Sequence, residues 1–195
     1  MYRNVIGGTV LALGLAACGG GADQDAAAVE EALDSADVAS VPVTDASQQA
    51  RAVLHDAEGT EVGTITITEE GGAVRLVGDV AGLAAGDHGF HLHETGSCEA
   101  PDFASAGGHF NPTSASHGSS QGPHAGDFPN VTAVDGTPTH IDQMNMMVTL
   151  ADAQPNSLFD ADGTALVIHA DPDDYESQPS GNAGARVACG VIERG

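Results

Sequence analysis

Short runs in which apolar and polar residues alternate recur from Arg51 onward, and they restrict the fold more than any other feature of the chain. Alternation of this kind is typical of β-strands that bury one face. The chain also has 26 glycines, no tryptophan and many valine, isoleucine and threonine residues, which favours short strands joined by turns. The sequence therefore predicts an all-β fold of about eight strands, either a closed antiparallel barrel or a sandwich. The expected strands are 52–55, 62–68, 73–79, 89–94, 131–134, 144–150, 165–169 and 185–192.

Two long segments interrupt the alternating pattern. Residues 94–130 are rich in glycine, proline, serine and histidine, and residues 171–185 separate the last two expected strands. Connections of this length are usually functional or disordered. We therefore expect a functional site to be built from these two segments and the strand ends beside them.

Three histidines belong to expected strands. His91 and His93 are two residues apart, and because strand side chains alternate, both imidazoles project from the same face. His169 ends an apolar run and can join them from a neighbouring strand, which gives an imidazole-rich site suited to copper. The alternatives are a surface or hydrogen-bonding role for the pair and a satisfied core histidine at position 169.

Four further candidate ligands lie in the first long segment. His117, His124 and Asp127 are in an irregular stretch that can wrap around a cation, and imidazoles with one carboxylate suit tetrahedral zinc. His109 completes a set of four. The alternative is a histidine-rich polar loop that binds no metal.

The N-terminal 18 residues have the features of an export signal. They contain one arginine, an apolar stretch too short to span a bilayer, and small residues before Cys18. The end of this segment, LAAC, resembles a bacterial lipobox, in which cleavage leaves a diacylated cysteine at the N-terminus; an ordinary signal peptide is the alternative. Gly19 resembles the pattern that directs such lipoproteins to the outer membrane. We therefore expect a periplasmic protein that contacts the membrane only through this lipid anchor.

Residues 19–50 form the next unit, with seven acidic residues and no basic or aromatic residue. Such a segment cannot bury enough apolar area to offset its ordering entropy, so we interpret it as a flexible acidic linker. The whole chain has a net charge of −23 and no lysine. A surface of this kind repels nucleic acid and anionic lipid headgroups, and neither is expected as a partner.

Two cysteines remain if Cys18 is acylated. Cys98 and Cys189 form an even pair in an exported protein, which suggests a disulfide. Free buried thiols are the alternative.

Four motifs occur in an order that resembles copper,zinc superoxide dismutase: GFHLHE, SAGGHFNP, HAGDFPNVTA and GNAGARVACGVI. The resemblance covers residues 51–193, which we expect to form the folded domain. It implies an eight-stranded Greek-key β-barrel with two long functional loops. It also implies an enzyme that converts two superoxide anions and two protons to oxygen and hydrogen peroxide. The implied copper ligands are His91, His93, His109 and His169, and the implied zinc ligands are His109, His117, His124 and Asp127.

The resemblance assigns roles to residues around the metals as well. Cys98 and Cys189 match the disulfide of the family, and Arg186 matches the arginine beside the copper channel. Asp173 is similar to the aspartate that links the two metal sites, with Asp174 as the neighbouring alternative.

Three histidines are outside this implied site. His88 resembles a structural histidine that hydrogen-bonds to loop backbone. His55 and His140 match nothing in the family and are expected at the surface.

In the implied mechanism, copper alternates between two oxidation states, while zinc is redox-silent and holds the long loop. His109, shared by both metals, supplies a proton. The segment after His169 has no lysine, so the basic residues that attract superoxide in other family members are missing, and we expect a slower encounter. The competing interpretations are a lipoprotein that stores copper or zinc, a catalytically silent barrel, and a zinc-only hydrolase. Family members occur as monomers and dimers, so a homodimer is possible.

Overall fold

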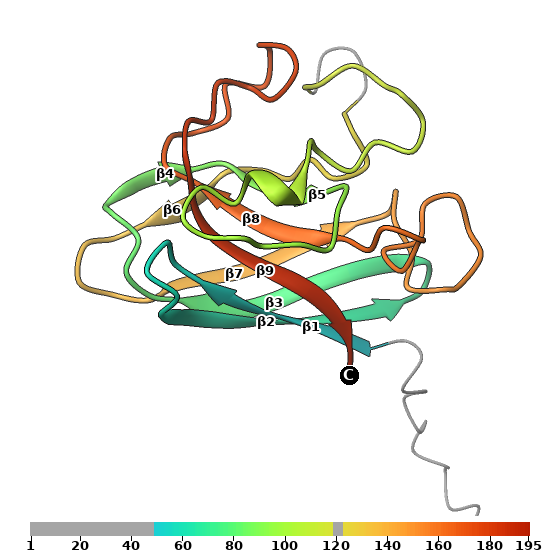
Figure 1. Cartoon of the computed structure of the whole chain (residues 1–195), viewed down its shortest axis with the longest axis horizontal. Coiled ribbons are helices and arrows are strands. Elements are labelled where there is room, and N and C mark those ends of the chain that lie inside the picture. Colours follow the sequence, from blue (N-terminus) through green and yellow to red (C-terminus); the bar gives the residue numbers. More distant parts are fainter. Residues whose placement is uncertain (1–48, 119–122) are drawn as a thin grey trace, which may run out of the picture. The chain divides into compact units, whose positions relative to one another are not determined.

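A computed structural model describes residues 49–118 and 123–195. This part of the chain contains nine strands, and seven of them form one curled antiparallel sheet in the order β5-β8-β9-β1-β2-β3-β7 (Figure 1). The prediction of an all-β fold is confirmed. Neither described range contains an α-helix, and neither contains a helix long and apolar enough to span a membrane. The strands are β1 Gln49–His55, β2 Glu61–Glu70, β3 Ala73–Val80, β4 Gly86–His88, β5 Phe90–His93, β6 Val131–Ala133, β7 Thr139–Asn145, β8 Ala165–His169 and β9 Arg186–Arg194.

The expected export signal with Cys18, and residues 19–48 of the expected linker, lie outside the described residues. β1 begins at Gln49, two residues before the expected start of the domain. This strand pairs with both β2 and β9, so its first residues belong to the sheet.

Gly89 alone separates β4 from β5, and the two runs form one interrupted strand. β4 pairs with β6, whereas β5 pairs with β8. Counting them together reduces nine strands to eight, the predicted number. Glycine is required between them because a Cβ atom here would lie 2.9 Å from the Cβ of Ala183 and 3.1 Å from the His91 ring. Gly89 also accepts a backbone hydrogen bond from His169 and donates one to Asp171, which joins β5 to the second long loop.

The core lies inside the curled sheet and is formed by the inward side chains of the alternating strands. In β2, Ile65 and Ile67 are fully buried, while the intervening threonine is exposed. Phe90 is equally buried, and its ring centroid lies 5.2 Å from that of Phe128 in the first long loop. Each such side chain stabilises the fold by about 1.5–3 kcal/mol through removal from water.

One predicted strand was wrong. The structure has β7 at Thr139–Asn145 in place of a strand at 144–150. The prediction followed the apolar residues after Met144, but the segment that pairs with β3 is the more polar one before it, in which Ile141 points inward and His140 outward. After β7, Val148 and Leu150 are buried from a loop.

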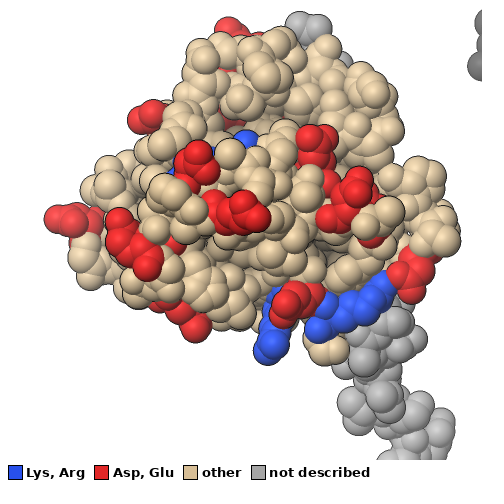
Figure 2. All heavy atoms as spheres, viewed as in Figure 1, with Lys and Arg blue, Asp and Glu red and all other residues tan. Residues whose placement is uncertain are grey.

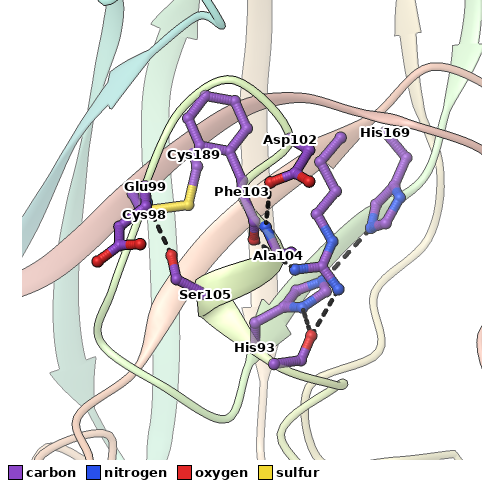
Figure 3. The surroundings of a disulfide bond; sticks show 11 residues. His93, Cys98, Glu99, Asp102, Phe103, Ala104, Ser105, His169 and Cys189 are labelled. Atoms are coloured by element: carbon purple, nitrogen blue, oxygen red, sulfur yellow. Dashed lines mark hydrogen bonds between the residues drawn. A yellow bond between two sulfur atoms is a disulfide. The ribbon is translucent and has the colours of Figure 1, made fainter.

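The two long loops lie on the same side of the sheet (Figure 1). The first contains a short 3₁₀ helix, η2 (Ala104–Ala106), and a disulfide joins it to β9 through Cys98 and Cys189, whose Cα atoms are 5.7 Å apart (Figure 3). The bridge closes a sequence separation of 91 residues, which in the chain-entropy model restricts the unfolded state by up to about 4–5 kcal/mol. The predicted disulfide is therefore present and fixes the first loop against the sheet.

Candidate metal centre

Buried side chains form two groups of potential metal ligands. Within each group the ligand atoms all lie within 4.8 Å of one another, and His109 belongs to both groups. All seven residues selected from the sequence are in these groups. The first group is His91, His93, His109 and His169, and the second is His109, His117, His124 and Asp127.

The first group starts from β5, a strand that is buried on both faces. His91 and His93 point away from the core, while Phe90 and Leu92 point into it. β8 pairs with this strand and brings His169 alongside from its last position. The expected alternation of imidazoles along one strand is therefore the feature that starts the site.

The first long loop runs beside β5 and delivers the shared histidine. Phe110 donates a backbone hydrogen bond to Leu92, and Leu92 donates one to Gly126. Isolated bridges pair His93 with His109 and His91 with Asp127. A Cβ atom at Gly126 would lie 2.4 Å from the carbonyl oxygen of Leu92, so the close approach of loop and strand requires glycine there.

Each histidine of the first group presents one ring nitrogen to the interior of the group. His93 Nδ1 donates to the carbonyl of Gly107 at 3.1 Å, and His169 Nδ1 donates to that of Gly184 at 3.3 Å. A neutral imidazole with one N–H group has a lone pair on its other nitrogen. The two Nε2 atoms are therefore left as acceptors only 3.3 Å apart, an arrangement that a cation between them would stabilise.

Burial keeps these rings neutral. It lowers the pKa of His91 to about 4, that of His169 to about 3 and that of His93 to about 2. Each ring therefore has a free lone pair at neutral pH, as a metal ligand requires.

Asp127 is the centre of the second group. Its carboxylate oxygens lie 2.7 Å from His109 Nδ1, 3.0 Å from His117 Nδ1 and 3.5 Å from His124 Nδ1. Burial alone would raise the pKa of Asp127, but the hydrogen bond from His109, the charges of His109 and His117 and the backbone N–H of His124 together outweigh burial and lower it. Three imidazoles around one ionised carboxylate fit a tetrahedral zinc ion.

The unpartnered polar atoms test whether metals fit these groups. Among the described residues, four buried ring nitrogens have no hydrogen-bond partner: His91 Nδ1, His109 Nε2, His117 Nδ1 and His124 Nδ1. Buried polar atoms are normally paired, so each of these atoms requires a ligand. A metal in each group would satisfy them. His109 can serve both groups because its Nδ1 faces Asp127 and its Nε2 is free.

Asp173, from the second long loop, connects the two groups. His91 Nε2 donates to one of its oxygens at 2.8 Å, and His117 Nε2 donates to the other at 2.9 Å. Burial would raise the pKa of Asp173, but these bonds and one from the Tyr175 backbone lower it well below its usual range. The alternative, Asp174, is exposed and bonds only within its own loop.

Arg186 lies at the start of β9, beside the first group. Its guanidinium donates to the carbonyls of Phe103 and Gly107 at 2.5 Å each, so η2 and its flanks hold it in place. Its charge contributes to the lowered pKa values of His93 and His169. An exposed cavity of about 450 Å³ is lined by Arg186 together with Pro101, Asp102, Ala104, Gly184 and Ala185.

Asp102 is a residue of this cavity that the sequence analysis missed. Burial lowers the pKa of Arg186, and the negative charge of Asp102 opposes that lowering. In the sequence, Asp102 is only an acidic residue in the loop that contains Cys98. It is 84 positions from Arg186, and no sequence pattern predicts that the two lie close together.

The other histidines lie outside both groups. His88 is buried, and its ring nitrogens contact the carbonyls of His169 at 2.7 Å and Ala84 at 2.8 Å, the backbone role that was predicted. His55 and His140 are exposed, as expected.

Acidic side chains are spread over the face shown in Figure 2, and the basic ones gather mainly at its lower edge. Residues 51–195 contain 21 acidic and four basic side chains, a net charge of −17. An approaching anion therefore meets a mostly negative surface before it reaches Arg186.

Comparisons with known proteins match most of the described part of the chain. A family model described as copper/zinc superoxide dismutase matches residues 61–192. The chain is 46% identical over 147 residues to the copper-zinc superoxide dismutase 2 of Aquifex aeolicus, which covers 74% of this chain and 86% of that protein. It is 41% identical over 153 residues to an extracellular copper-zinc superoxide dismutase of Brugia pahangi, covering 72% of this chain and 73% of that one. The crystal structure of a superoxide dismutase-like protein from Bacillus subtilis superposes with a TM-score of 0.68 at 38% identity, covering 72% of this chain and 96% of that one.

Proposed function

This chain belongs to the copper/zinc superoxide dismutase family, and from that premise we propose that its histidine centre removes superoxide at the cell envelope. Its activity is the conversion of superoxide to oxygen and hydrogen peroxide, with copper and zinc as cofactors. The observation that carries the residue assignment is the set of buried ring nitrogens without partners, which converge in two groups that share His109.

We assign one metal to each group. Copper would be held by His91, His93, His109 and His169, and zinc by His109, His117, His124 and Asp127. Bound copper would supply the one-electron redox chemistry that superoxide disproportionation needs. Zinc would hold the first long loop and polarise the shared ring.

The remaining steps belong to the side chains of this protein. Arg186 binds the anionic substrate, because a guanidinium keeps its charge and its fork is already fixed by two carbonyls. His109 Nε2, which has no hydrogen-bond partner, is the atom that would hold a proton for the reduced product when it is not bound to copper. Asp173 orients His91 and His117 and so acts as a positioning residue for both groups.

The assignment is tested by measuring dismutase activity and metal content together. Purified protein with about one copper and one zinc per chain should be active, and a copper-specific chelator should abolish activity while zinc is retained. Activity should return when copper is restored. Full occupancy of both metals without activity would favour metal storage and contradict the proposal, and activity in zinc-only protein would contradict the copper assignment.

Ionic strength should change the rate in a characteristic direction. Because the folded part has a net charge of −17, added salt should screen repulsion of superoxide, and kcat/KM should rise as salt increases toward about 0.1 M, where the Debye length is about 10 Å. Stopped-flow measurement of superoxide decay at several salt concentrations checks this. A D102N variant should show a higher rate at low salt and a weaker dependence, whereas a steep fall with salt in the native protein would contradict net repulsion.

We place the enzyme outside the cytoplasm, tethered by Cys18. One relative is named as an extracellular enzyme, and the disulfide suits an oxidising compartment. When cells are grown with a labelled fatty acid, the native protein in the membrane fraction should carry the label, whereas a C18S variant should not. Labelling that persists in C18S, or native protein without label, would show that Cys18 is not acylated.

A further inference from the structure

The methionines of this chain are grouped at the end of β7. Apart from Met1, the sequence has methionine only at positions 144, 146 and 147. All three side chains are exposed, to 64%, 81% and 40% respectively. Methionine is normally an interior residue that fills gaps in a core, so three exposed thioethers within four residues require an explanation.

The backbone holds these side chains on the outside. The intervening Asn145 is buried: its side-chain amide donates to the carbonyl of Ala125 at 2.8 Å, and its oxygen accepts from the backbone of Met147 at 2.7 Å. The carbonyl of Met147 in turn accepts from the Asn156 side chain at 2.8 Å. The turn is therefore fixed on both sides, and Met146 continues the outward series of β7 to which Met144 belongs.

The spacing allows the sulfur atoms to meet. Met144, Met146 and Met147 lie within four consecutive residues, with neighbouring Cα atoms about 3.8 Å apart. Each methionine has three rotatable bonds that can direct its thioether toward the others. Arg75, the partner of Met144 across the sheet, does not oppose a cation there, because Asp142 binds its guanidinium through two contacts of 2.8 and 2.6 Å.

Thioethers are soft, uncharged ligands that suit the soft Cu(I) ion. We propose that Met144, Met146 and Met147 form a surface site for Cu(I), separate from the histidine centre. Asn145 joins this turn to Ala125, the neighbour of His124, so the site is attached to the loop that contributes ligands to the second group. A chain that needs copper can thereby collect the reduced ion on its own surface.

The test uses the full-length protein with copper and zinc already bound in the histidine centre. Cu(I) is added without oxygen in buffer that contains a low concentration of acetonitrile, a weak Cu(I) ligand that keeps the ion in solution, and bound copper is measured after equilibrium dialysis. The native protein should retain about one additional Cu(I) per chain, and the variant M144L/M146L/M147L should bind it at least about tenfold more weakly, because leucine keeps the apolar volume and removes the sulfur. The control V134L changes another exposed apolar residue and should bind Cu(I) like the native protein.

Ag(I), a redox-inert substitute for Cu(I), provides a second measurement. In protein labelled with ¹³C at the methionine methyl groups, Ag(I) should shift the three signals of this turn. Native protein that binds no additional Cu(I), unchanged affinity in the leucine variant, or Ag(I) that leaves these signals in place would each overturn the proposal. Dismutase activity should be the same in the native protein and the leucine variant, so failure here is distinguishable from failure of the histidine-centre assignment.

Discussion

Replacing Arg186 with glutamine should lower kcat/KM for superoxide by roughly tenfold or more, while copper and zinc remain bound. The guanidinium has five N–H groups and uses two of its nitrogens to donate to Phe103 and Gly107, which fixes its orientation and leaves other N–H groups for an anion. Glutamine is neutral and too short to replace both functions. Stopped-flow superoxide decay together with metal analysis of the same sample measures the effect.

An R186K variant provides the matched control for this prediction. Lysine keeps the positive charge but lacks the planar fork that meets two carbonyls at once, so its activity should lie between those of the native protein and R186Q. Added salt should still change the kcat/KM of R186K, because lysine keeps the positive charge. If R186Q turns over at a nearly native rate with both metals present, Arg186 has no direct part in binding superoxide.

Replacing Asp173 with asparagine should weaken zinc binding by about 10–100-fold, the usual effect of removing a residue that orients metal ligands. The two carboxylate oxygens accept N–H groups from His91 and His117 simultaneously. An amide offers only one oxygen, and its NH₂ group would face the N–H of one imidazole. That ring must then turn, which moves the nitrogen that faces the metal, or change its tautomer, which puts a proton on that nitrogen. Competition with a chromophoric zinc chelator measures the affinity.

D174N is the control for this second variant because it changes the neighbouring carboxylate. Asp174 is exposed and contacts only Ser177, Asn182 and the loop backbone, so its replacement should leave zinc affinity within about twofold of the native value. Circular dichroism of the metal-free proteins separates loss of zinc affinity from loss of folding. Equal zinc affinities for D173N and the native protein would show that the buried aspartate does not orient the ligands.

Much of the fold could be predicted because burial on one face leaves a period of two in the sequence. That period identified β2 and β3 and the common face of His91 and His93. It failed where apolar residues lie outside strands: the exposed methionines at the end of β7 and the buried Val148 and Leu150 of the following loop displaced the predicted strand toward 144–150. The true strand, β7, contains polar residues that pair with β3. The register between strands is set by contacts across the sheet, which neighbouring residues do not reveal.

The sequence by itself determined the types of candidate ligand and their order: imidazoles along one strand, imidazoles and a carboxylate in a loop, and a histidine at the end of another strand. Only the tertiary structure decided which groups meet. It selects Asp173 over Asp174, brings Asp102 and Arg186 to the lining of one cavity, and leaves His109 with one nitrogen facing each ligand group. The physical reason is that hydrogen bonds and charge interactions act over a few ångströms. Residues far apart in the chain reach that distance only in the curled sheet. Gly89 and Gly126 are needed as well, because a side chain at either position would prevent the loops from approaching β5.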